Sequence, residues 1–128
     1  DRIAAIGVVA GTIGLPEKQV ESPKGPVSAI IVHGKADETV PYDSTVQALI
    51  KSTSAPDSAK WWAEKLGCGP GVRAERESGN LLVDSFNGGK DGCAVELVTI
   101  VDGGHSWPSE KISATDLIWE FFQSHPKR

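Results

Sequence analysis

A chain of 128 residues with a net charge of −4 has the size of one small globular domain. Its 13 Lys and Arg residues form no basic cluster among 17 Asp and Glu residues, so nucleic acid is not an expected partner. The longest apolar runs, residues 3–10 and 95–101, are much shorter than the roughly 20 residues that cross a bilayer, and no membrane segment is expected either.

The first expected element is a buried strand over residues 3–10, an apolar run with no start signal before it. The sequence contains no Met, and the pattern predicts that the chain was cut, processed or built incompletely upstream of Asp1. A loop rich in Pro and Gly covers residues 12–26. Residues 27–32 are almost continuously apolar and β-branched, which is typical of a parallel strand covered on both faces. Function is expected at the C-terminal end of such a strand.

Two helices are expected next in the chain. The first covers about residues 43–51, with Asp43 or Ser44 as its cap. The second is capped by Ser54, carries a proline in its first turn, and ends at Gly67 in a left-handed turn. Three of the four tryptophans are expected in the core: Trp61, Trp62 and Trp119.

The remaining elements complete one α/β domain. Residues 80–86 and 95–101 are expected to pair as a hairpin across the turn-rich segment 87–92. A closing helix is expected over residues 115–125, halted by Pro126. The expected fold is therefore α/β, with about three parallel core strands, one added antiparallel hairpin strand and flanking helices.

Two titratable side chains follow expected parallel strands. Asp37 lies in a loop between Gly34 and Pro41, and His105 follows a Gly-Gly pair. A rigidly held carboxylate can accept a hydrogen bond from an imidazole and fix its tautomer, as the acid of a catalytic triad does. An imidazole on a glycine loop can reach across neighbouring strand ends and act as the base. Either residue alone is more typical of a turn or a surface, but the combination predicts a catalytic pair.

A nucleophile is absent from the sequence, which contains no GxSxG. The α/β-hydrolases run in the order nucleophile, acid, histidine, so only the last two steps are present. Ser106 adjoins the base, but neighbouring loop residues seldom bring nucleophile and base within hydrogen-bonding reach. Ser44 and Ser85 sit in helix-start and strand contexts, where a structural role is expected.

Three further side chains are expected to contact a substrate. Trp107 is expected to form an aromatic wall beside the base, with Val40 and Tyr42 opposite. Such a surface suits an acyl chain or an aryl ring. Ordinary packing of Trp107 against Pro108 is the alternative.

No metal site is expected. His33, Asp37 and His105 lack a ligand spacing, and His33 is expected instead to bond the backbone of the Asp37 loop. Cys68 and Cys93 lack the paired CxxC spacing of zinc sites. A disulfide in an oxidising compartment is the favoured interpretation of the two cysteines, and two unlinked thiols in a cytosolic protein are the alternative.

At this point the sequence resembles the C-terminal half of the polyhydroxybutyrate-depolymerase and feruloyl-esterase group of α/β-hydrolases. The resemblance runs along nearly the whole chain. It is carried by HGKADETVPY at residues 33–42, WWAEKLGC at 61–68, Cys93, GGHSWP at 103–108 and DLIWEFFQSHP at 116–126. GGHSWP together with the tryptophan-rich helix ending in Gly-Cys is the most specific part.

The resemblance implies that Asp37 is the triad acid, His105 the general base, and Cys68 to Cys93 a structural disulfide. Residues 1–128 would then be a single partial domain, the C-terminal portion of an α/β-hydrolase fold without the N-terminal half and its nucleophile elbow. The implied activity is hydrolysis of esters of hydroxyalkanoates, hydroxycinnamates or acylated sugars through an acyl-serine, with no metal or organic cofactor. A secreted or periplasmic location is expected, and the chain alone is expected to be inactive until the missing half or an oligomer partner joins it.

Two other functions stay open at this level. One is a non-catalytic α/β module that self-associates through the edge strand over residues 3–10. The other is a dienelactone-hydrolase-like enzyme with a cysteine nucleophile, for which Cys68 and Cys93 are poorly placed.

Overall fold

Five strands form one sheet in the middle layer of the fold: β1 (Ala5–Val9), β2 (Ser28–Gly34), β3 (Val72–Arg76), β4 (Leu81–Phe86) and β5 (Val95–Ile100). Their spatial order in this computed structural model is β1-β2-β5-β4-β3. The structure describes residues 2–14, 19–43 and 52–127, and the helix expected over about residues 43–51 lies almost entirely outside them.

The sheet is parallel at one side and antiparallel at the other. Strands β1, β2 and β5 run parallel, whereas β4 is antiparallel to β5 and β3 is antiparallel to β4. The expected three parallel strands and the hairpin of β4 and β5 are thereby confirmed. Residues 87–94 join these two strands, and a 3₁₀ turn, η3 (Lys90–Gly92), lies within that connection.

Strand β3 was not expected from the sequence. All five of its residues are exposed, so it shows no apolar alternation that would mark a half-buried strand. A second 3₁₀ turn, η2 (Glu77–Gly79), connects β3 to β4, so that the two strands pair antiparallel. On that pair, Arg73 donates two hydrogen bonds to the Asp84 carboxylate, at 2.8 and 2.9 Å.

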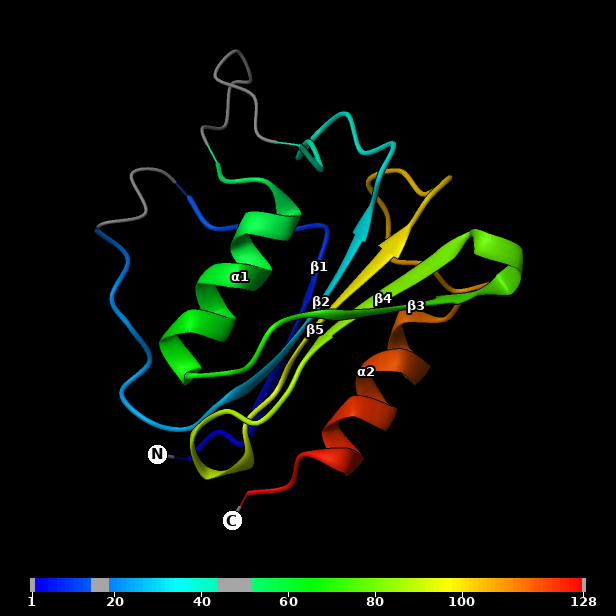
Figure 1. Cartoon of the computed structure of the whole chain (residues 1–128). Coiled ribbons are helices and arrows are strands. Elements are labelled where there is room, and N and C mark those ends of the chain that lie inside the picture. Colours follow the sequence, from blue (N-terminus) through cyan, green and yellow to red (C-terminus); the bar gives the residue numbers. More distant parts are fainter. Residues whose placement is uncertain (1, 15–18, 44–51, 128) are drawn as a thin grey trace.

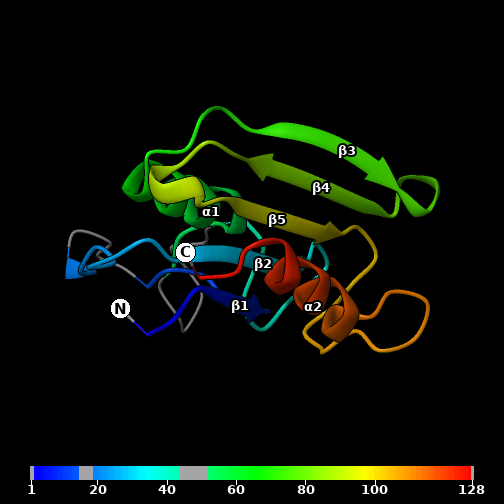
Figure 2. The same ribbon diagram turned by 90° about the horizontal axis from the view of Figure 1, so that it is seen from below.

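Two helices cover opposite faces of the sheet, α1 (Ala55–Leu66) and α2 (Ala114–Ser124) (Figures 1 and 2). The α1 cap is the one expected, because the Ser54 side chain accepts a hydrogen bond from the Asp57 N–H and Gly67 adopts a left-handed conformation with φ of 70°. The hydroxyl of Ser113 caps α2 in the same way, by accepting a hydrogen bond from the Asp116 N–H.

The two faces of the sheet hold two separate cores. Beneath α1 lie Ala29, Ile31, Val95 and Leu97, together with small residues of the helix. Beneath α2 lie Ile30, Val32, Val98 and Ile100, with Ile118 and Phe121 of the helix. Every residue of β2 is buried because this strand is covered on both faces, as its continuous apolar run predicts.

The burial of the tryptophans agrees only in part with the expectation that Trp61, Trp62 and Trp119 lie in the core. Trp61 is buried and Trp62 is half-buried, with their rings in an edge-to-face contact. The expectation for Trp119 was wrong, because its side chain is 60% exposed. Successive helical residues are separated by about 100°, so α2 turns Trp119 away from the sheet when it buries the neighbouring Ile118.

The loops after β2 and β5 approach each other without room for a side chain. A Cβ atom on Gly34 would overlap the carbonyl oxygen of Gly103 and lie 2.6 Å from that of Gly104. Two main-chain hydrogen bonds tie the same loops together, from Lys35 N to Ile100 O and from Ala36 N to Gly103 O, both at 2.9 Å. The glycines at these positions therefore set the distance between the two strand ends.

We expect Gly34→Ala to lower the free energy of unfolding by at least about 3 kcal/mol, the upper end of the usual cost of overpacking, because the overlapping atoms are backbone. Urea unfolding followed by circular dichroism measures this loss. The matched control is Gly25→Ala, since a Cβ there has no neighbour within 4 Å. Equal stability of the two variants would contradict the close approach of the loops.

Candidate active site

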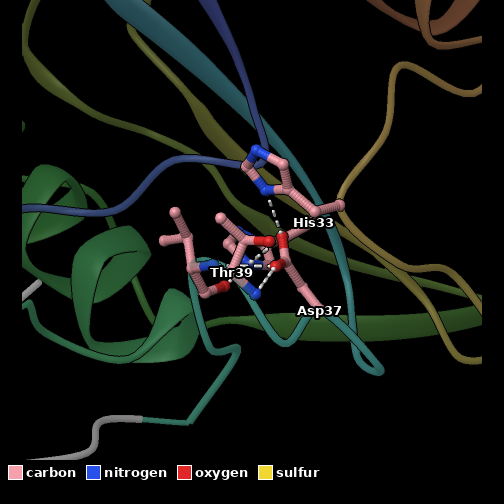
Figure 3. A network of polar contacts seen from close by, with 5 residues as sticks. His33, Asp37 and Thr39 are labelled. Carbon is pink, nitrogen blue, oxygen red and sulfur yellow. Dashed lines mark hydrogen bonds and ion pairs between the residues drawn. The ribbon is translucent and has the colours of Figure 1, made fainter. Parts of the chain in front are cut away.

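Asp37 is held in the turn that follows β2. Its Oδ1 atom accepts hydrogen bonds from the main-chain N–H groups of Thr39 and Val40, both at 2.8 Å (Figure 3). The side chain is fully buried. An Asp side chain that accepts from the backbone two residues on forms an Asx turn, so the loop sequence itself fixes the direction of the carboxylate.

His105 meets this carboxylate from the loop after β5. Its Nδ1 atom lies 2.9 Å from Asp37 Oδ2, although the two residues are 68 positions apart in the sequence. The sheet brings them together because β2 and β5 are parallel neighbours, and their C-terminal ends lie side by side. The structure thus joins the two residues that the sequence predicted as a pair.

The charge of Asp37 decides the tautomer of His105. Burial is the largest influence on the pKa of Asp37 and raises it, but the hydrogen bonds from Val40, His105 and Thr39, with the charge interaction with His105, together outweigh burial. The pKa of Asp37 is therefore lowered from its usual value, and the ionised carboxylate can only accept hydrogen bonds. His105 must then donate from Nδ1, which in a neutral ring leaves the lone pair on Nε2.

The His105 ring is partly open to solvent. Its side chain is 43% exposed, whereas the carboxylate behind it is shielded. With its lone pair on Nε2, the exposed His105 ring can act as a base and accept a proton from a hydroxyl group that approaches from solvent. The buried Asp37 carboxylate holds the other side of the ring. Among the described residues, no serine, threonine or cysteine forms a hydrogen bond with His105.

His33 lies under the same turn, near the end of β2. Its Nε2 atom is 2.8 Å from the carbonyl oxygen of Val40 and 3.5 Å from Asp37 Oδ2 (Figure 3). The expected bond between His33 and the backbone of the Asp37 loop is confirmed. In the part of the chain that the structure describes, no three His, Cys, Asp or Glu side chains are grouped so that they could hold a metal ion.

The three residues expected to contact a substrate differ in their exposure to solvent. Trp107 is 57% exposed, and its indole N–H donates to the Thr115 hydroxyl at 3.1 Å, so the ring lies beside the start of α2. Val40 is half-buried and contributes main-chain groups to the Asp37 turn. Tyr42 is only 7% exposed, and its hydroxyl pairs with that of Thr99 at 2.7 Å. The buried side chain of Tyr42 therefore presents no open face to a substrate.

The predicted disulfide is not formed in the structure, where Cys68 and Cys93 are both free thiols. The sulfur of Cys68 instead lies 3.8 Å from the main-chain oxygen of Cys93. Burial raises the pKa of the Cys68 thiol, with the neighbouring Cys93 adding to the effect. A protonated thiol is a poor nucleophile. Cys93 precedes β5 and His105 follows it, so the strand separates this cysteine from the base.

Neither Ser106 nor Ser85 forms a hydrogen bond with His105 in the described part of the chain. Ser106 is exposed, and its main-chain N–H bonds to the Gly104 carbonyl in the loop of the base. Ser85 is half-buried in β4, which runs antiparallel to β5. Ser44 lies outside the described residues.

A cavity of about 1110 Å³ lies at the opposite end of the sheet from Asp37 and His105. Ala4, Ser28 and Cys93 line it, and these residues stand at the N-terminal ends of the three parallel strands. It is therefore separate from the candidate site.

Comparison with models of known protein families and with curated protein sequences gave no match to either. Within the described residues, no helix is long and apolar enough to cross a membrane. The class that the fold defines is an α/β protein with a mixed five-stranded sheet between two helices. Its relation to the hydrolases and its expected export stay predictions.

The lowered pKa of Asp37 predicts a pH-dependent contribution to stability. A carboxyl group with a lower pKa in the folded than in the unfolded state stabilises fully above the unfolded value of about 3.9. This contribution is lost as the pH falls through the folded value. We expect the difference in free energy of unfolding between wild type and Asp37→Asn to be largest near pH ~6 and to shrink toward pH ~3.

Urea unfolding at several pH values measures this difference. Asp91→Asn removes one exposed carboxylate and separates the effect of net charge from that of the site. An Asp37→Asn difference that stays constant across this range would mean that the Asp37 carboxyl is not stabilised in its ionised form.

Proposed function

We propose that this chain supplies the acid, Asp37, and the base, His105, of a serine esterase triad whose nucleophile lies on another segment. The observation that supports the proposal is the 2.9 Å bond between His105 Nδ1 and the buried Asp37 carboxylate, with the ring itself partly exposed. The absence of GxSxG from the sequence is the reason for assigning the nucleophile elsewhere.

In the proposed reaction, a serine hydroxyl transfers its proton to His105 Nε2 as its oxygen attacks the ester carbonyl. Asp37 stabilises the imidazolium that forms and keeps Nδ1 protonated throughout. His105 then donates the proton to the departing alcohol, which leaves an acyl-serine. Water, deprotonated by the same Nε2 atom, releases the acid product and restores the serine.

The substrate class comes from the sequence resemblance to polyhydroxybutyrate depolymerases and feruloyl esterases. Esters of hydroxyalkanoates, hydroxycinnamates or acylated sugars are the proposed substrates. The exposed ring of Trp107, two residues after the base, is suited to contact an aryl or acyl group of such an ester.

The isolated chain should be inactive toward p-nitrophenyl acetate, because imidazole and carboxylate alone lack an acylatable group and oxyanion donors. We expect no difference in hydrolysis rate between wild type and His105→Ala. In the full product of the gene, or in its complex with a GxSxG-bearing chain, the same substitution should lower kcat by roughly 10³-fold or more.

The matched control in the full protein is His125→Ala, which removes an imidazole beyond α2 and at the other end of the sheet. It should leave kcat within about twofold of wild type, since the His125 ring packs against Phe121 at the end of α2 and does not contact Asp37 or His105. Turnover by the isolated chain that depends on His105 would contradict the need for an external nucleophile.

A self-associating module is the second candidate, and the edge strand β1 favours it. Among the residues that the structure describes, β1 pairs with a strand on one side only, and Ile3, just before it, is 59% exposed. Trp119 adds a second exposed apolar group on α2, which packs across β1 and β2. An unpaired strand edge beside exposed apolar side chains is a common route to association.

Light scattering coupled to size-exclusion chromatography tests this second candidate. If the chain forms a dimer through β1 and α2, Trp119→Ser should weaken the dimer by about tenfold or more in Kd, as expected for an aromatic anchor at an interface. Val72→Ser, on strand β3 at the other side of the sheet, removes an apolar residue that is 68% exposed and should leave the dimer intact. A monomer at all concentrations would rule out self-association.

A further inference from the structure

His33 occupies a costly position for a polar residue. It lies in β2 between the two cores and is only 1% exposed. Its ring stands edge-on to that of Tyr42, with 5.8 Å between the centroids. A buried imidazole in such surroundings must satisfy both ring nitrogens or lose free energy.

One of the two nitrogens is satisfied and the other is not. The acceptors near Nε2 are the Val40 carbonyl at 2.8 Å and Asp37 Oδ2 at 3.5 Å, so Nε2 carries the proton. The Nδ1 atom is buried and has no hydrogen-bond partner among the described residues. An apolar side chain would avoid this unsatisfied atom, so packing of the strand does not explain a histidine here.

Val40 forms hydrogen bonds with both His33 and Asp37. Its carbonyl oxygen accepts from His33 Nε2, and its N–H donates to Asp37 Oδ1 at 2.8 Å. His33 thus restrains the residue that holds one carboxylate oxygen, and it lies near the other oxygen, which accepts from His105 Nδ1 at 2.9 Å. The buried ring of His33 therefore restrains Val40 directly and lies close to the Asp37 carboxylate (Figure 3).

We propose that His33 is a positioning residue for the Asp37 and His105 pair: its Nε2–H group holds Val40 in the turn so that the Asp37 carboxylate stays directed at His105. The inference rests on the proposed function only in treating Asp37 as the acid of a triad. His33 touches neither substrate nor nucleophile in this role.

The test follows the carboxyl carbon of Asp37 by NMR during a pH titration of the chain, together with hydrogen exchange of the Val40 amide. In His33→Leu the donor is lost, so the pKa of Asp37 should rise above its wild-type value. The Val40 amide should exchange at least about tenfold faster, because a local hydrogen bond that protects the turn has been removed. His33→Gln can still present an N–H group to the Val40 carbonyl, and both readouts should return toward wild type.

Ile31→Val is the matched control, because it trims a buried side chain of the same strand without touching the turn. Both readouts should stay as in wild type. If His33→Leu does not fold, the comparison between His33→Asn, whose amide is too short to reach, and His33→Gln decides the question.

A folded His33→Leu or His33→Asn variant with wild-type titration of Asp37 and wild-type exchange of Val40 would overturn the proposal. An equal change in Ile31→Val would also overturn it. Neither readout needs a serine or an ester, so the result stands apart from the esterase proposal. In the full enzyme, His33→Leu should lower kcat by about tenfold or more with little change in KM, since positioning acts on the transition state.

Discussion

The ionised carboxylate of Asp37 is the feature around which this end of the molecule is arranged. Its side chain is fully buried, and ionisation there is tolerated because Thr39, Val40 and His105 all direct N–H groups at it. A buried charge without such partners would be strongly destabilising. The turn after β2, the loop after β5 and the tautomer of His105 are each consistent with this one requirement.

Parallel pairing of β2 and β5 makes the arrangement possible. The two strands end at the same edge of the sheet, although α1, β3 and β4 lie between them in the chain. Gly34 and Gly103 then allow their loops to approach until main-chain atoms touch. Residues far apart in sequence thereby form one site whose spacing is set by backbone contacts. Such a site is more rigid than one held by flexible side chains.

Much of the fold could be read from local patterns. Continuous burial of β2 follows from its apolar run, and the Ser54 cap and Gly67 end of α1 follow from turn and capping chemistry. Strand β3 gave no such signal, because all its side chains are exposed and it is positioned by pairing with β4. The exposure of Trp119 was likewise hidden, since hydrophobicity does not reveal which side of a helix meets the sheet.

Local patterns were enough to predict the α/β class, the parallel character of β2 and the choice of Asp37 and His105, because strand periodicity and loop composition are properties of neighbouring residues. Three other features are visible only in the folded molecule: Asp37 and His105 are hydrogen-bonded, Tyr42 is buried against Thr99, and the Cys68 sulfur faces a carbonyl oxygen. Each of these contacts joins residues that are far apart in the sequence and become neighbours only when the chain folds. No local pattern encodes such contacts, since they arise from the packing of the whole sheet.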